Sequence, residues 1–268
     1  MGNNWFNAMT PFPPSLAHPR TLKVRSPIST KAILKGYGLL CGVLLCFFQP
    51  AHAQSIDFVD AKFSVQFNNT PTDGKNFLKI KRDHHRYDVD FELDHWLASA
   101  SQKATFEMDH CKVRPISYVA TSKRPLKEET RQTLEFDWTH KKAEYKGKDE
   151  QKSFNLDTAV YDPISFFFEA RCDLMAGKKQ FSYSLINKGR QNTQTYKVIG
   201  TQKVETGLGE FETLIVERVR DSKKRQTRLY VAPDLDYLLV KIEHQEGRLL
   251  NVVATLKSMD YRLTDTSK

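Results

Sequence analysis

Six histidines beyond position 53 have the clearest capacity for chemistry in this sequence: His84, His85, His95, His110, His140 and His244. Imidazole groups, together with nearby carboxylates, are ligands for zinc or copper. The spacing contains neither H-x-x-x-H nor H-x-H, and adjacent strand residues such as His84 and His85 point to opposite faces. We therefore expect solvent-facing histidines, no metal site and no cofactor.

The usual sequence signatures of catalysis do not occur. The chain has no G-x-S-x-G, S-x-x-K, P-loop or G-x-G-x-x-G motif. Asp157, Asp162 and Glu169 lie close together in the sequence, but acids near a helix start are favoured by the helix dipole in any case. An acid/base pair defined only in space stays open as an alternative. The expectation is a protein that is not an enzyme.

The first 53 residues predict export. They contain no acidic residue, and Lys31 and Lys35 precede an apolar stretch of 13 residues from Gly36 to Phe48. This stretch is shorter than the roughly 20 residues of a membrane-spanning helix. Ala51 and Ala53 form a small-x-small site, which predicts cleavage before Gln54. We expect residues 1–53 to be an N-terminal extension with a cleaved signal peptide, and residues 54–268 to be a single periplasmic domain.

Removal of this leader changes the charge and the cysteine count. The chain has 41 Lys+Arg and 32 Asp+Glu, and the mature part keeps 36 and 32 of them, so its basicity does not indicate nucleic-acid binding. Of four cysteines, only Cys111 and Cys172 remain. Two cysteines in an oxidising compartment most simply form one disulfide. The alternative is a redox-active or nucleophilic thiol, although no C-x-x-C motif is present.

Beyond Gln54, the dominant hydrophobic period is two residues, which is typical of strands with one buried face. It occurs in Ala61-x-Phe63-x-Val65-x-Phe67, Tyr87-x-Val89-x-Phe91-x-Leu93, Phe181-x-Tyr183-x-Leu185 and Leu238-x-Val240-x-Ile242. Turn-forming residues such as Gly207-Leu208-Gly209 separate these runs. The sequence therefore predicts a mainly β fold, a single curved antiparallel sheet or open barrel built as a meander.

One segment, residues 162–176, predicts an amphipathic helix. Asp162 is placed as N-cap, Pro163 at the first helical position and Gly177 at the C-terminal cap. The helix contains Phe166-Phe167-Phe168, and Tyr183 follows in the next predicted strand. These aromatic residues form either an ordinary core or the lining of a cavity that the sheet encloses incompletely, with the helix as its lid.

Clusters of basic residues, such as Lys79-Ile80-Lys81-Arg82 and Lys223-Lys224-Arg225, are interleaved with acidic ones. They are typical of solvated turns. In an envelope protein they also allow peripheral contact with anionic lipid head groups.

The second half of the chain resembles an exported bacterial family known as domain of unknown function 3108. The matching residues are Val198-Ile199-Gly200, the run from Glu205 to Leu214, Val216-Glu217-Arg218 and the run from Arg225 to Ile242. Asp162-Pro163-Ile164-Ser165 and Ala176-Gly177-Lys178 also fit the family pattern. The resemblance implies a periplasmic β-rich protein, similar by looser analogy to lipoprotein carriers of the cell envelope. It implies no reaction and no catalytic residues.

Together these observations lead to one functional hypothesis and two alternatives. We expect a non-enzymatic periplasmic protein of the Gram-negative envelope that binds an apolar or lipid-like ligand on a curled β-sheet. Phe166, Phe167, Phe168 and Tyr183 are expected to line its concave side. The first alternative is an interaction or structural module that adds a protein partner's strand to an open sheet edge. The second is a hydrolase with an unrecognised set of catalytic residues.

Overall fold

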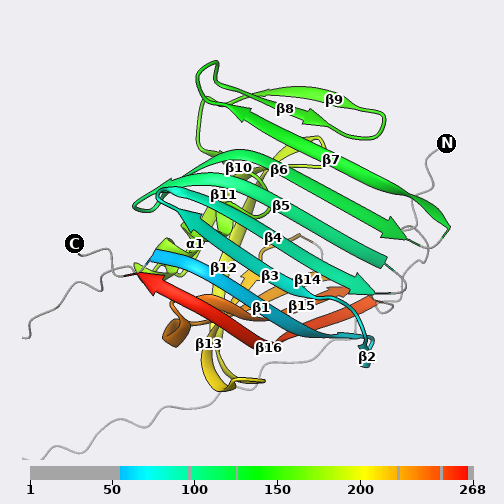
Figure 1. The fold of residues 1–268 in the computed structure, drawn as a ribbon, viewed down its shortest axis with the longest axis vertical. Coiled ribbons are helices and arrows are strands. Elements are labelled where there is room, and N and C mark those ends of the chain that lie inside the picture. The colour runs from blue at the N-terminus through cyan, green and yellow to red at the C-terminus, as the bar shows by residue number, and fades with distance from the viewer. Residues whose placement is uncertain (1–54, 96–97, 125, 222–223, 248–249, 265–268) are drawn as a thin grey trace, which may run out of the picture. The chain divides into compact units, whose positions relative to one another are not determined.

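The computed structural model describes residues 55–264, except 96–97, 125, 222–223 and 248–249 (Figure 1). The predicted leader and its cleavage site, including Ala51, Ala53 and Gln54, lie outside these residues. The described part contains one α-helix, α1 (Phe166–Met175), and one 3₁₀ helix, η1 (Pro233–Leu235). Its strands are β1 (Ser55–Phe67), β2 (Thr70–Thr72), β3 (Phe77–Asp83), β4 (Arg86–His95), β5 (Ala98–Asp109), β6 (Lys112–Arg124), β7 (Lys127–Asp137), β8 (Lys142–Lys146), β9 (Gln151–Asn155), β10 (Val160–Tyr161), β11 (Gln180–Asn187), β12 (Arg190–Thr206), β13 (Gly209–Arg218), β14 (Arg225–Ala232), β15 (Leu238–Glu246) and β16 (Leu250–Thr264).

All of these strands belong to one sheet, which is not closed into a barrel. The order is β10-β11-β12-β13-β14-β15-β16-β1-β3-β4-β5-β6-β7-β8-β9, and β2 pairs with β1. Every pairing is antiparallel except the short one between β10 and β11. The prediction of a mainly β fold, with one curved antiparallel sheet or open barrel and a single α-helix, is confirmed.

The period-two pattern produces the sheet's buried face. In β1, Ala61, Phe63 and Val65 are buried, whereas Lys62 and Ser64 between them are exposed. The buried side chains of the successive strands join in one hydrophobic cluster on the concave side. Burial of one face and solvation of the other fix the register of each strand, because a slip of one residue would reverse both faces.

The sheet curls because its edges are close together in the chain and because its ladders are irregular. Residues 156–159 connect β9, at one edge, to β10, at the other. β-bulges interrupt the pairings β1–β16, β5–β6, β12–β13 and β14–β15, and each bulge increases the local twist and bend. β10 contacts β6, so β7, β8 and β9 extend beyond the point where the curl comes closest to closing.

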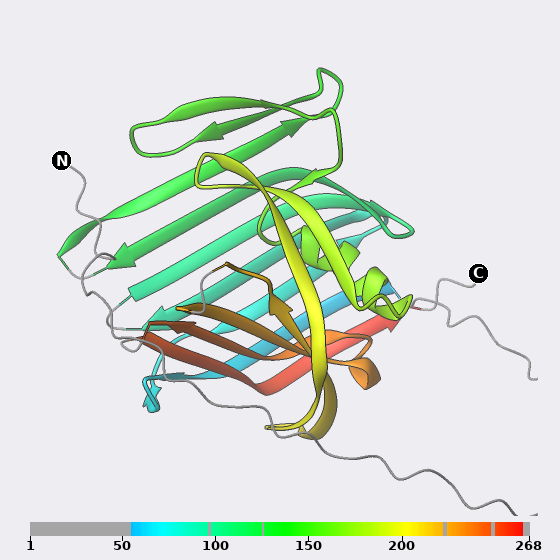
Figure 2. The same cartoon turned by 180° about the vertical axis from the view of Figure 1, so that it is seen from behind.

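α1 lies on the concave side of the curled sheet, behind β3 and β4 in Figure 1 and in front of them in Figure 2. Sequence reasoning placed its start at Asp162 and Pro163, which is about one turn too early. The Asp162 carboxylate instead accepts hydrogen bonds from the backbone N–H groups of Ile164 and Ser165, at 2.8 and 2.9 Å. These bonds hold a turn that leads directly into the helix, which begins at Phe166.

The end of α1 agrees with the prediction, since Gly177 follows it in the left-handed region with φ of 76°. The helix buries more than the single face that an amphipathic helix would bury. Its buried residues are Phe166, Phe168, Ala170, Arg171, Cys172 and Leu174. The helix is covered on several sides because it lies inside the curl. Within the described residues, no helix has the length and apolar character needed to cross a membrane.

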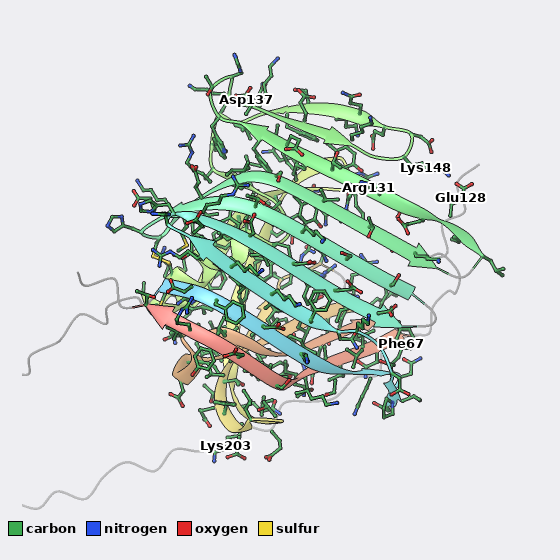
Figure 3. All side chains as sticks on the ribbon, viewed as in Figure 1. Phe67, Glu128, Arg131, Asp137, Lys148 and Lys203 are labelled. Carbon is green, nitrogen blue, oxygen red and sulfur yellow. A yellow bond between two sulfur atoms is a disulfide. The ribbon has the colours of Figure 1, made fainter. Side chains whose placement is uncertain are left out.

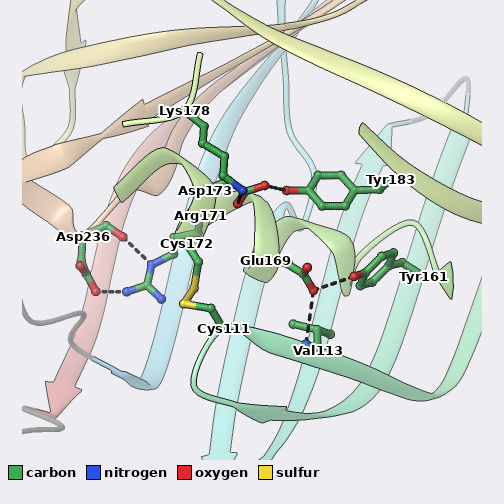
Figure 4. Close-up of a disulfide and its surroundings, with 10 residues drawn as sticks. All are labelled: Cys111, Val113, Tyr161, Glu169, Arg171, Cys172, Asp173, Lys178, Tyr183 and Asp236. Carbon is green, nitrogen blue, oxygen red and sulfur yellow. Dashed lines mark hydrogen bonds and ion pairs between the residues drawn. A yellow bond between two sulfur atoms is a disulfide. The ribbon is translucent and has the colours of Figure 1, made fainter. Parts of the chain in front are cut away.

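Two bonds attach α1 to turns at the same end of the sheet (Figure 4). Cys172 forms a disulfide with Cys111 in the β5–β6 turn, with a Cα–Cα distance of 5.9 Å, and the predicted pairing is confirmed. Arg171 donates from Nε to the backbone carbonyl of Asp236 and forms an ion pair with its carboxylate. The Arg171 side chain is only 3% exposed, and burial lowers its pKa to about 10. The guanidinium therefore stays charged at neutral pH and depends on the nearby carboxylate.

Replacing both cysteines by alanine should lower the free energy of unfolding by about 2–4 kcal/mol, because the unfolded chain regains the entropy of a closed loop of about 60 residues. Urea denaturation of the oxidised proteins measures this difference. A reducing agent should bring the wild type to the stability of the variant and leave the variant unchanged. Equal stability of the two oxidised proteins would contradict the structural role of the bond.

Asp236→Asn should cost about 3 kcal/mol or more, because it removes the carboxylate that balances a buried guanidinium charge. Asparagine also tolerates the left-handed backbone at this position, where φ is 56°. The control is the double variant Arg171→Met/Asp236→Asn, which removes both charges and should be more stable than Asp236→Asn alone. A loss below about 1 kcal/mol in Asp236→Asn would show that the ion pair is not needed.

Candidate functional site

The curl encloses a cavity of about 500 Å³ that is partly open to solvent. This volume lies within the range of small-molecule binding sites, roughly 300–1,000 Å³. Strands from both halves of the sheet line it, together with the first turns of α1. Aliphatic side chains contribute much of the wall: Ile56, Ile80, Val89, Leu185, Leu238 and Ile242.

Phe166, Phe167 and Phe168 all line this cavity at the helix. Phe168 packs against Phe106 and Tyr87 of β5 and β4, with ring centroids 4.6 and 5.5 Å apart. Phe166 packs on the opposite side against Tyr196 of β12, at 5.1 Å. The three consecutive phenylalanines therefore bridge the two walls of the curl and form an apolar floor.

Tyr183 has a different position from the one that the sequence suggested. It is buried and does not belong to the cavity lining. Its ring packs against Phe166 and Phe181, each at 5.8 Å, and its hydroxyl donates to Asp173 at 2.6 Å (Figure 4). Burial, followed by the hydrogen bond to Asp173, raises the pKa of Tyr183. Tyr183 thus supports the cavity floor from behind.

Two arginines that sequence reasoning did not single out, Arg218 and Arg220, also line the cavity. Arg218 pairs with Tyr196 across β12 and β13, and Arg220 follows two residues later. Period-two spacing continues from the buried Val216 through both arginines, so they are cations in line with an apolar face. This spacing is the feature of the sequence that could have indicated that the two arginines face the interior. Burial is the largest cause that lowers the pKa of each guanidinium.

The cationic residues of the cavity lie at different places relative to the helix. β11 starts directly after α1, so its last residue and the adjacent Lys188 lie at the strand end away from the helix. Arg218 instead pairs with Tyr196, whose ring stacks on Phe166 at 5.1 Å. Arg218 therefore lies beside the phenylalanine floor, and Arg220 lies two residues farther along the chain.

A groove of about 450 Å³ adjoins the cavity and shares Ala120, Thr121, Ser122, Gln132 and Lys188 with it. The groove is also lined by Lys127, Arg131 and the ion pair of Glu128 with Lys148, which Figure 3 shows between β7 and the β8–β9 turn. The side of the cavity that adjoins this groove is consequently polar and carries cationic side chains.

The histidine side chains that the structure describes do not gather into one site. His84, His110 and His140 lie at exposed turns, and each Nδ1 pairs with an aspartate of the same turn. Among the residues that the structure describes, no group of three or more His, Cys, Asp or Glu side chains could hold a metal ion. His244 lies instead beside Thr227, with its Nδ1 2.9 Å from the threonine hydroxyl.

Burial lowers the pKa of His244; the charge of Glu246 opposes this shift, and the charges of Arg220 and Arg225 add to it. The folded state therefore favours neutral imidazole, and stability should decline as the pH falls through about 6.5, the pKa of the unfolded chain. Urea denaturation at pH 7.5 and 5.5 should show a larger loss for the wild type than for His244→Gln. The matched control is His140→Gln at an exposed turn, which should follow the wild type. Equal losses in wild type and His244→Gln would contradict this linkage.

Comparison with known proteins extends the description of the fold. No curated protein matches the sequence. The crystal structure of a β-barrel-like protein of domain of unknown function DUF1849 from Brucella abortus is similar, with a TM-score of 0.52 and 11% sequence identity over 77% of this chain and 98% of that chain. At this identity the likeness shows the fold alone. The family model for the protein of unknown function DUF3108 matches residues 62–247. The chain therefore belongs to the DUF3108 family.

Proposed function

We propose that this protein is a non-enzymatic binding protein of the Gram-negative periplasm, and that its cavity takes an apolar or lipid-like ligand. The observation that carries the proposal is the cavity of about 500 Å³ between the curled sheet and Phe166, Phe167 and Phe168. Burial of an apolar chain against such a wall contributes roughly 25 cal/mol per Å² removed from water.

Two features support the periplasmic location. The signal-peptide pattern ends at Ala53, and the Cys111–Cys172 disulfide is a bond that persists in oxidising compartments. Contact with the periphery of a membrane is part of the proposal, since Lys127, Arg131 and Lys188 line the groove that adjoins the cavity. The polar groups at the cavity are positioned to orient a ligand, and the proposal assigns them no reaction and no cofactor.

Native mass spectrometry of residues 54–268, purified from periplasm without detergent, tests the proposal directly. An adduct in the lipid mass range that is lost on denaturation would support the carrier function. A bare mass, together with no binding of an added apolar probe, would contradict it.

Ala100→Phe should block the cavity, because Ala100 lines it and a phenyl ring would occupy ligand volume. We expect binding of the uncharged fluorophore N-phenyl-1-naphthylamine to weaken by about tenfold or more, which corresponds to ~1.4 kcal/mol. The matched control is Ser101→Phe, whose side chain points to the other face of β5. Equal probe affinities for the two variants would argue that the probe binds elsewhere.

One observation favours the alternative of partner binding at a sheet edge. β9 pairs only with β8 among the described residues, and most of its side chains are exposed. An open edge can accept a strand from another chain. A photo-crosslinker at Ser153 should then yield a defined adduct with one envelope protein, and a proline in β9 should abolish it.

A further inference from the structure

Arg218 and Arg220 carry polar groups that the protein itself leaves unsatisfied. The Nε atom of each side chain is buried and has no hydrogen-bond partner among the described residues. The contact of Arg220 with Thr227, from Nη2 to Oγ1, is long at 3.4 Å. A buried donor without an acceptor is costly, and more so on a charged group. Two such donors on one cavity wall indicate that an acceptor from outside the chain completes the site.

The surrounding charges favour an anionic acceptor. None of the described residues that line the cavity is Asp or Glu. Glu246 pairs with Arg225 and also acts on Arg220, and Arg171 at the helix is paired with Asp236. Arg218, Arg220 and Arg225 together therefore carry more positive charge than this one carboxylate balances.

The position of the arginines relates them to the apolar floor. They line the same cavity as the three phenylalanines of α1, and Arg218 pairs with Tyr196, whose ring stacks on Phe166. A ligand that fills the cavity would thus meet both hydrocarbon-like surface and guanidinium groups. This is the distribution of polarity in a fatty acid or another anionic amphiphile.

We propose that Arg218 and Arg220 bind the anionic head, carboxylate or phosphate, of an amphiphile whose acyl chain extends toward Phe166, Phe167 and Phe168. A guanidinium presents a planar set of donors that fits two oxygens of either head group. The inference rests on the proposed function and adds the chemical class of the ligand. It also assigns the contacts of each part, with the head at the two guanidinium groups and the chain against the phenylalanines.

The test compares three ligands with equal or similar chains: palmitate, 1-palmitoyl lysophosphatidate and the uncharged 1-hexadecanol. Their affinities are measured by displacement of N-phenyl-1-naphthylamine from the wild-type protein and from Arg218→Gln/Arg220→Gln. The matched control is Arg228→Gln, which removes an arginine that pairs with Glu217 and does not line the cavity.

The wild type should bind at least one anionic ligand about tenfold or more tightly than hexadecanol, the factor expected for a hydrogen bond to a charged group. The double variant should lose this preference and keep its affinity for hexadecanol, whereas Arg228→Gln should keep both. Tighter binding of palmitate would assign the carboxylate as the head, and tighter binding of lysophosphatidate the phosphate.

Other outcomes separate this inference from the proposed function. Equal wild-type affinities for all three ligands would overturn the role of the arginines and leave the carrier function intact. Failure of all three ligands, and of the fluorophore, to bind the wild type would overturn both. The preference of the wild type is read without any variant, so a folding defect in the double variant would not hide the result.

Discussion

Four residues, 156–159, carry the chain from one edge of the sheet to the other, and this short connection constrains everything else in the fold. Fully extended, the segment from Asn155 to Val160 spans at most about 18 Å. A flat sheet with this strand order would place β9 and β10 much farther apart, because neighbouring strands are about 4.8 Å apart. The sheet must therefore curl until its edges approach. The next segment, α1, then begins inside the curl, where its phenylalanines meet both walls.

The same arrangement makes the interior asymmetric. At one end, α1 is fixed by a disulfide, an ion pair and stacked rings, so the cavity has an apolar floor that is covalently tied to the β5–β6 turn. Beside this floor, Arg218 and Arg220 line the cavity with Nε donors that no described residue accepts. The wall of the cavity therefore combines apolar rings with guanidinium groups.

Particular residues show how far the sequence predicts this structure. The alternation of buried and exposed residues in β1 and the helix-ending glycine at position 177 depend on residues that are close in sequence. Both could therefore be predicted from the sequence. The start of α1 was wrong because the Asp162 carboxylate caps a preceding turn as readily as a helix. Tyr183 lies behind the floor, where its hydroxyl donates a hydrogen bond to Asp173 in the last turn of the helix. Such pairings depend on where α1 lies on the sheet, and this position cannot be predicted from the hydrophobic periodicity of the sequence.

The arginines illustrate the opposite case. Their spacing from Val216 is visible in the sequence, but V-E-R-V-R-D reads equally well as a solvated strand end. Gly207 is similar, because a glycine is expected in a turn but is required here by contact with β16. A Cβ atom at this position would lie 1.9 Å from the carbonyl oxygen of Lys257. In both cases the role of the residue depends on a contact with a part of the chain that is distant in sequence. The sequence therefore shows the residue type but not the contact that requires it.

The pairing of β1 with β16 joins the first and last described strands, Ser55 with Thr264, in the interior of the sheet. β16 therefore lies in the interior of the sheet, between β15 and β1, and not at an edge. Before β16 pairs, β1 and β15 are open edges in addition to β9 and β10, and open edges can pair with other chains. Contacts of such long sequence separation also form slowly. Pairing of β16 with β1 and β15 thus completes the sheet. A chaperone would be most useful before this pairing.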